Sequence, residues 1–266
     1  MATDHSPAPS PELLYLLSGD EEDFQAATAD LLPPDLAEAL NELPVEAAAR
    51  IVSALPFHRT VQLFDEPELD RRGELFEQLE ESVAVPVLEA MSADQQVELF
   101  RELPDTAVQR LIHVLDEPTR NTLRLLLRFP PTTAGGIMTT EFVSVPASWT
   151  ADRVRQHILE VGSGKETVYA IYVLDPVSQQ LLHVVSLREI LLAEPNTPVS
   201  RIGTVRAPVS VRPLTDREDV ARIISKYNLL AIPVVDGAQR VLGVVTVDDV
   251  IDAMVRETTE DVQKLG

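Results

Sequence analysis

The first half of the chain carries apolar residues at helical spacing, in short units separated by proline. Between about residues 11 and 128 each unit runs roughly 11–12 residues, and three of them end in Leu43-Pro44, Leu55-Pro56 and Leu103-Pro104. Proline fits the first turn of a helix and blocks the end of the preceding one. The pattern predicts a string of helices, each too short to be stable alone, that bury their leucines by stacking into a superhelix.

After Gly135-Gly136 the pattern changes to an alternation of strands and helices. Extended segments are predicted at 142–145, 168–174 and 181–186, with helices at 150–161 and from 187 to 192. Thr150 is the predicted N-cap residue of the helix at 150–161. Adjacent glycines indicate a turn that needs backbone freedom, and we expect a hinge there.

The same strand-helix unit then occurs a second time. The prediction is an extended segment at 209–211, a helix at 216–227, strands at 230–235 and 241–245, and a helix from Asp248. Tyr172-Val-Leu-Asp175 of the first copy corresponds to Pro233-Val-Val-Asp236 of the second, and Val184-Val-Ser-Leu-Arg-Glu189 corresponds to Val244-Val-Thr-Val-Asp-Asp249. The repeat predicts two α/β domains in tandem.

The last nineteen residues form an amphipathic helical pattern with one acidic and one apolar stripe. Asp249, Asp252, Glu257 and Glu260 gather on one side, opposite an apolar side that includes Met254. Carboxylates at this spacing repel one another. Either water solvates an acidic face or something positive lies against it.

Charge is distributed unevenly over the 266 residues, whose formal net charge is −21. The first 120 residues hold 26 acidic residues against seven arginines and no lysine. Nucleic acid is therefore a poor partner, and divalent cations would relieve the repulsion, although solubility alone also explains such acidity. The chain has no cysteine, its five histidines lack the spacing of zinc ligands, and no apolar run or signal peptide predicts a membrane span.

The paired α/β copies resemble two tandem CBS domains, in the hairpin Ile232-Pro-Val-Val-Asp236, the strand end Gly243-Val-Val-Thr246 and the Thr-x-x-Asp start of the next helix. The whole arrangement, with Ala134-Gly-Gly-Ile-Met-Thr139 and the acidic C-terminal segment, resembles the cytosolic region of MgtE-type magnesium channels over residues 11–266. The resemblance implies a multidomain fold: an all-α superhelical N domain (11–130), CBS domain 1 (137–200), CBS domain 2 (201–250) and a connecting or plug helix (251–266).

By resemblance, this region senses Mg²⁺: ions between acidic surfaces hold a compact state in which the plug helix closes a transmembrane pore. It would lie on the cytoplasmic side of the cell membrane, as a homodimer joined through CBS domains and plug helices. Asp94 and Glu98 would face the second CBS domain near Asp249 and Asp252. Asp216 also falls at an acidic position, whereas Asn228 and Gln62 stand where aspartate and glutamate are expected. The predicted metal-binding residues are Asp94, Glu98, Glu218, Asp249, Asp252, Glu257, Glu260 and Asp261.

Two other functions stay open. Many CBS pairs bind adenine nucleotides, and Thr246, Asp249 and Arg188 would then contact the nucleotide, although the first copy has Ser186, Glu189 and His183 at motif positions. A pure interaction scaffold would respond to no ligand. An enzyme has little support, because no nucleophile-elbow, zinc-protease or dinucleotide motif is present.

Overall fold

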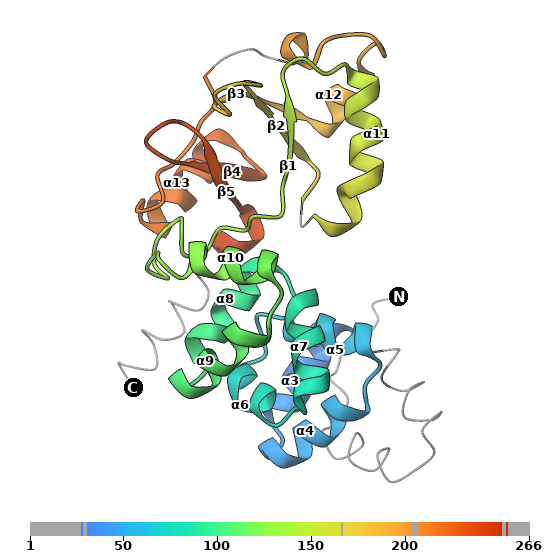
Figure 1. Cartoon of the computed structure of the whole chain (residues 1–266), viewed down its shortest axis with the longest axis vertical. Helices are drawn as coiled ribbons and strands as arrows, with labels where there is room; N and C mark the ends of the chain where they lie inside the picture. The colour runs from blue at the N-terminus through green and yellow to red at the C-terminus, as the bar shows by residue number, and fades with distance from the viewer. Residues whose placement is uncertain (1–27, 29–30, 166, 204–206, 252–253, 255–266) are drawn as a thin grey trace, which may run out of the picture. The chain divides into compact units, whose positions relative to one another are not determined.

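A computed structural model describes residues 28, 31–165, 167–203, 207–251 and 254 (Figure 1). The predicted plug-helix residues Asp252, Glu257, Glu260 and Asp261 lie outside these described residues. The chain divides into two compact units, residues 1–123 and 124–266.

Short helices joined by tight turns make up the described part of the first unit (Figure 1). They are α3 (Pro33–Asn41), α4 (Val45–Ala54), α5 (Phe57–Phe64), α6 (Arg72–Glu77), α7 (Glu81–Ala90), α8 (Ala93–Glu102), α9 (Asp105–Val114) and α10 (Glu117–Leu126), the last of which runs into the second unit.

The Leu-Pro steps act as predicted at the helix boundaries. Pro44, Pro56 and Pro104 are the N-cap residues of α4, α5 and α9, and their extended backbone stops the preceding helix. Alternate helices pack on one another: α3 on α5, α4 on α6, α5 on α7 and α6 on α8. Their leucines are buried, and the rings of Phe64 and Phe76 meet edge to face at 5.6 Å. The predicted stack of helices is thereby confirmed.

The second unit contains the two predicted α/β copies. In the first, β1 (Val143–Pro146) pairs in parallel with β2 (Ala170–Leu174), which pairs antiparallel with β3 (Leu181–Ser186). In the second, β4 (Ala231–Val235) pairs antiparallel with β5 (Val241–Thr246). The helices are α11 (Ala151–Val161), α12 (Leu187–Leu192) and α13 (Arg217–Tyr227), with 3₁₀ turns η1 (Gly162–Gly164) and η2 (Val199–Arg201).

A shared core joins the two copies. Tyr172 and Leu181 of the first copy pack with Val235 and Val244 of the second, and the ring of Phe142 meets Tyr172 edge to face. Burial raises the pKa of Tyr172, whose hydroxyl has no hydrogen-bond partner among the described residues. The amide of Leu181 donates to the carbonyl of Gln239 at 2.9 Å. The copies therefore fold as a pair.

The Gly135-Gly136 turn is not a free hinge, contrary to expectation. The amide of Gly135 donates to the carbonyl of Pro213 at 2.8 Å, and further along the segment the amide of Thr139 donates to the carbonyl of Val244 at 2.8 Å. A Cβ on Gly136 would lie 2.0 Å from the carbonyl oxygen of Pro130. The glycines are needed for close packing, so this segment is bound to the second copy.

Candidate functional site

Two of the predicted metal-binding residues, Asp94 and Glu98, lie one turn apart on α8. The Asp94 carboxylate accepts a 3.0 Å hydrogen bond from Nε2 of Gln95, while its other oxygen, Oδ1, is buried with no hydrogen-bond partner among the described residues. Burial raises the pKa of Asp94, and the neighbouring charge of Glu98 adds to this effect. An ionised Asp94 thus needs a positive charge or another donor.

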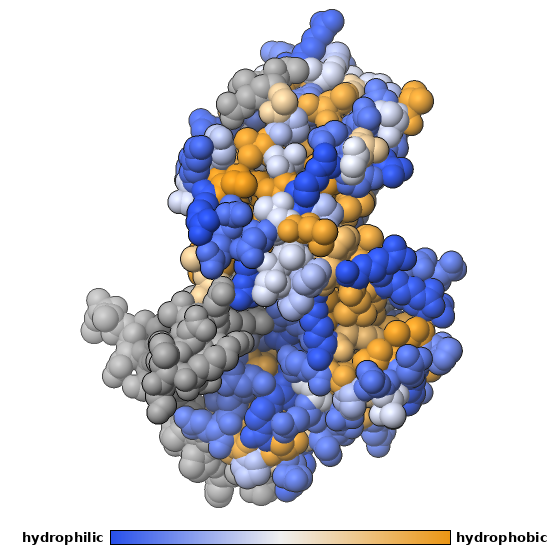
Figure 2. Space-filling view, turned by 90° about the vertical axis from the view of Figure 1, so that its left-hand side faces the viewer, coloured by the Kyte–Doolittle hydropathy of each residue, from blue (hydrophilic) through white to orange (hydrophobic). Residues whose placement is uncertain are grey.

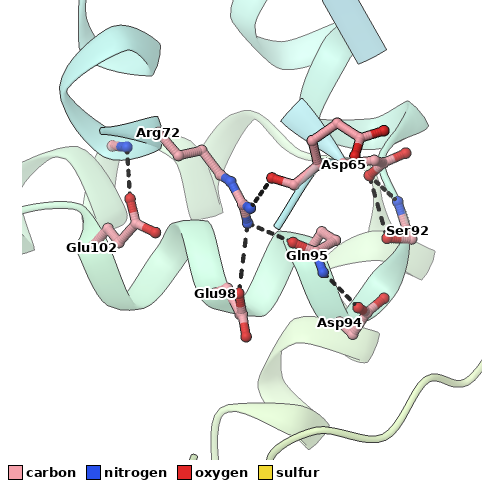
Figure 3. A network of polar contacts seen from close by, with 9 residues as sticks. Asp65, Arg72, Ser92, Asp94, Gln95, Glu98 and Glu102 are labelled. Carbon is pink, nitrogen blue, oxygen red and sulfur yellow. Dashed lines mark hydrogen bonds and ion pairs between the residues drawn. The ribbon is translucent and has the colours of Figure 1, made fainter. Parts of the chain in front are cut away.

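A buried guanidinium organises the surroundings of Glu98 (Figure 3). Arg72, 1% exposed, donates to Oε1 of Gln95 at 2.6 Å and to the carbonyl of Glu66 at 2.7 Å. Its Nη1 lies 3.8 Å from Oε2 of Glu98, whose side chain is 27% exposed. Glu98 is therefore partly neutralised by the chain itself while one side of it reaches solvent.

Asp65 joins this network and was not predicted from the sequence. As the C-cap residue of α5 it accepts hydrogen bonds from the amide of Ser92 at 2.9 Å and from its hydroxyl at 3.3 Å. Burial raises the pKa of Asp65 to about 6, and the charge of Asp94 contributes. Two carboxyl groups with raised pKa values, those of Asp65 and Asp94, thus lie near the start of α8. Ionising either one is unfavourable because both are buried and their negative charges repel each other.

The first turn of α13 carries the next predicted acid, Glu218. Asp216 is the N-cap residue, and its carboxylate accepts from the amide of Glu218 at 2.9 Å. Glu218 and Asp219 both form ion pairs with Arg222, at 2.8 and 2.7 Å. Glu218 is therefore exposed but already paired.

Asp249 lies in the first turn of the helical segment that begins at residue 247, three residues after the cap residue Thr246. Its Oδ2 accepts from the hydroxyl of Thr246 at 2.6 Å and from its amide at 3.2 Å. Ser186 and Glu189 make the same reciprocal contacts at the start of α12, a capping box. The Thr-x-x-Asp motif therefore has a structural role in helix capping beside any role in ligand binding.

The two departures from the expected acidic pattern have local explanations. Asn228 ends α13 in the left-handed conformation, φ 51°, which asparagine tolerates better than most residues. Oε1 of Gln62 accepts from Arg59 at 3.1 Å. Neither residue adds negative charge, and each has a packing or hydrogen-bonding role in the folded chain.

A cleft of about 390 Å³ opens between the two CBS copies. Tyr169, Ser186 and Glu189 line it from the first copy, and Pro208, Asn228 and Ala231 from the second. Arg188 lines an adjoining groove with Leu191, Leu192 and Leu230, whereas Thr246 and Asp249 line neither. The polar side chains that line this cleft include Ser186 and Glu189, which occupy the motif positions of the first copy.

Within the described part of the chain, no group of three or more histidine, aspartate or glutamate side chains is placed to hold a metal ion. No helix among those residues is both long and apolar enough to cross a membrane.

Comparisons with known proteins identify the family to which this stack of helices and pair of α/β copies belong. Residues 31–132 match the family described as MgtE intracellular N domain, and residues 199–256 match the CBS domain. The chain is 33% identical over 254 residues to the magnesium transporter MgtE of Thermus thermophilus, covering 94% of this chain and 56% of the relative. It is 29% identical to the magnesium transporter MgtE of Bacillus subtilis, covering 96% of this chain and 56% of the relative.

Solved structures agree. The cytosolic domain of the Mg²⁺ channel MgtE in complex with ATP is similar with a TM-score of 0.84 and 32% identity, covering 92% of this chain and 99% of that one. The soluble part of a magnesium transporter gives a TM-score of 0.81 and 28% identity, covering 93% and 99%. The chain belongs to the MgtE family, and it spans 56% of the length of the two curated relatives named above.

Proposed function

We propose that this chain is the cytosolic Mg²⁺-sensing region of a magnesium-selective channel or transporter. Bound Mg²⁺ stabilises a compact state that closes a pore contributed by a transmembrane domain of the full-length protein, and the chain itself catalyses no reaction. The observation that carries the proposal is the buried Oδ1 of Asp94, without a hydrogen-bond partner among the described residues, one turn from Glu98 on α8. The proposed location is the cytoplasmic side of the cell membrane.

These residues suit magnesium as a hydrated ion. Mg²⁺ keeps several of its waters and is held by one or two carboxylates rather than by a full protein cage. Sites completed by a second surface therefore require no preformed cluster of three acids. The proposed contacts are Asp94, Glu98, Glu218 and Asp249, together with Asp252, Glu257, Glu260 and Asp261, which lie outside the described residues.

Compaction would follow from binding linkage. At a net charge of −21 the separated acidic surfaces repel each other. Ions that bind only the compact form stabilise it by mass action, in proportion to the logarithm of their concentration. The chain would thus report the Mg²⁺ concentration as a shift between two conformations.

We also propose that the region works as a homodimer through its CBS domains and plug helices. The groove lined by Arg188 carries exposed apolar side chains: Tyr169 is 63% exposed, Leu191 60%, Leu192 76% and Leu230 60%. Figure 2 likewise shows apolar residues reaching the surface of both units on the face it presents. A second copy would remove such surface from water.

Limited proteolysis with and without millimolar Mg²⁺, at constant ionic strength, tests the sensing function. We expect protection that saturates with Mg²⁺ and that sodium chloride reproduces only in part, because screening reduces repulsion but bridges no carboxylates. Equal cleavage rates in both salts would argue against a magnesium sensor.

Adenine nucleotide is a second candidate ligand, supported by the cleft between the CBS copies and by the relative solved in complex with ATP. An aromatic ring at Tyr169 and the polar side chains of Glu189 and Asn228 suit a base and a ribose. Calorimetric titration with ATP tests this. Tyr169→Ala should weaken the heat signal, while Tyr227→Ala, which changes a half-exposed tyrosine outside the cleft lining, should preserve it.

A further inference from the structure

Arg222 already lies against the carboxylates of Glu218 and Asp219 in the first turn of α13, where a metal cation would otherwise neutralise them. Arg222 lies one turn after Glu218 and Asp219, and its two Nη atoms pair with them separately, at 2.8 and 2.7 Å. Asp216 is engaged in capping the helix. The paired carboxylates of this turn are therefore neutralised in part before any metal ion binds.

The first unit also has an arginine beside a predicted metal-binding glutamate, but there the arginine is buried. Arg72 lies 3.8 Å from Glu98 and is 1% exposed, held by Gln95 and the Glu66 carbonyl. Such a guanidinium is fixed in place. The Arg222 side chain, by contrast, is 69% exposed, and those of Glu218 and Asp219 are 51% and 57% exposed. Of these two arrangements, the α13 ion pairs are the ones that solvent reaches.

An exposed ion pair is weak enough for a divalent ion to displace. Solvent and salt screen it, and holding two long side chains together costs rotamer entropy. A hydrated Mg²⁺ that approaches Glu218 must displace the guanidinium or share the carboxylate with it, and the positive charge that stays nearby repels the ion. Arg222 and Mg²⁺ therefore compete for one carboxylate.

We propose that Arg222 sets the Mg²⁺ concentration at which this region becomes compact, by competing with the ion for the carboxylate of Glu218. This inference rests on the proposed magnesium-sensing function. It assigns Arg222 a positioning and tuning role: the arginine holds the Glu218 carboxylate apart from the metal until the Mg²⁺ concentration is high enough to replace it.

The test compares Arg222→Gln with two matched variants of the full chain, using MgCl₂ titrations at constant ionic strength followed by limited proteolysis. Arg222→Gln should lower the midpoint of protection by about threefold to tenfold, the range expected for removing one screened charge beside a site. Arg222→Lys keeps the charge and should stay near the parent midpoint. Arg240→Gln removes the same charge from an ion pair with Asp236, in the turn before β5, and should also leave the midpoint unchanged.

Each outcome decides something. An unchanged or higher midpoint for Arg222→Gln, or a decrease that Arg240→Gln reproduces, overturns the competition. If Arg222→Lys shifts as far as Arg222→Gln, packing rather than charge is responsible, and the inference is wrong. If the parent itself shows no protection by Mg²⁺, the sensing function fails and this inference fails with it.

Discussion

Arg72 donates a 2.6 Å hydrogen bond to Oε1 of Gln95, and this contact joins the start of α6 to the first turn of α8 across 23 residues of sequence. The same guanidinium binds the carbonyl of Glu66 and faces Glu98. One buried cation therefore holds in register two helices of the first unit, on the side where Asp94 and Glu98 lie (Figure 3).

Replacing this cation should unfold the first unit more readily. Arg72→Met removes the donor to Oε1 of Gln95 and one of the donors to the Glu66 carbonyl, which keeps the amide of Leu69. Breaking a buried charged network costs about 3–5 kcal/mol of unfolding free energy. Urea denaturation followed by far-ultraviolet circular dichroism measures the loss. Arg110→Met is the control, because its pair with Glu81 is more than half exposed and contributes less than about 1 kcal/mol. Equal losses in the two variants would mean that the buried network adds nothing special.

Asp65 should make the stability of the Mg²⁺-free protein depend on pH. Its pKa is raised in the folded state from 3.8 to about 6. Between these values the folded state binds more protons than the unfolded state, so stability falls as pH rises through this window. The ionised form then costs roughly 1–3 kcal/mol at neutral pH.

Asp65→Asn removes this cost while keeping an oxygen that accepts from Ser92. As pH rises from 4.5 to 7.5, the unfolding free energy of the variant should increase relative to that of the parent by about 1–2 kcal/mol. Urea titrations at the two pH values measure this change. Asp70→Asn, at an exposed aspartate, serves as the control. A parent and variant whose difference is independent of pH would show that burial does not perturb Asp65.

Asp249 has two roles that substitution can separate. Asp249→Ala removes the charge and the carboxylate that accepts from the amide and hydroxyl of Thr246, while Thr246 still accepts from the amide of residue 249. Asp249→Asn keeps an oxygen for Thr246 and removes only the charge. Both variants should need more Mg²⁺ than the parent for protease protection. If Asp249→Asn becomes protected at the parent's Mg²⁺ concentration, Asp249 supports the Thr246 cap and is no metal contact.

The Gly135-Gly136 segment predicts a steric effect in the second unit. Gly136→Ala would place a Cβ 2.0 Å from the Pro130 carbonyl oxygen, against backbone that must shift. Overpacking of this kind costs about 1–3 kcal/mol. Trp149, the one tryptophan of the chain, lies in this unit and reports its urea unfolding by fluorescence. At Gly237 an added Cβ meets nothing within 4 Å, so Gly237→Ala should unfold like the parent.

Local patterns predicted the fold well because the signals themselves are local. Leu43-Pro44 and Leu55-Pro56 end and start helices through steric effects between neighbouring residues, which the sequence states directly. The Thr246-x-x-Asp249 spacing likewise predicted a helix start, and the structure has a helical turn there. Together with the hairpin at 232–236 and the strand end at 243–246, this motif carried the resemblance to a CBS pair.

Properties that come from tertiary burial could not be read in this way. Nothing near Asp65 in sequence distinguishes it from Asp70, because its desolvation and its donor Ser92 come from a helix packed 27 residues later. The hinge expected at Gly135-Gly136 failed for a similar reason: adjacent glycines indicate either freedom or close approach, and only the contact with Pro213 decides between them. A count of acidic residues also misses Arg222, whose pairing changes what Glu218 can bind.

The central claim is that Mg²⁺ converts this chain from an extended to a compact state, and small-angle X-ray scattering tests it most directly. The radius of gyration is measured with MgCl₂ and with NaCl at the same ionic strength. Light scattering of the same samples checks that the oligomeric state is the same in both salts. The proposed sensor predicts a smaller radius of gyration in Mg²⁺ than in NaCl, with a midpoint that falls for Arg222→Gln. An identical radius of gyration in both salts would contradict magnesium sensing and favour a nucleotide-binding or scaffold function.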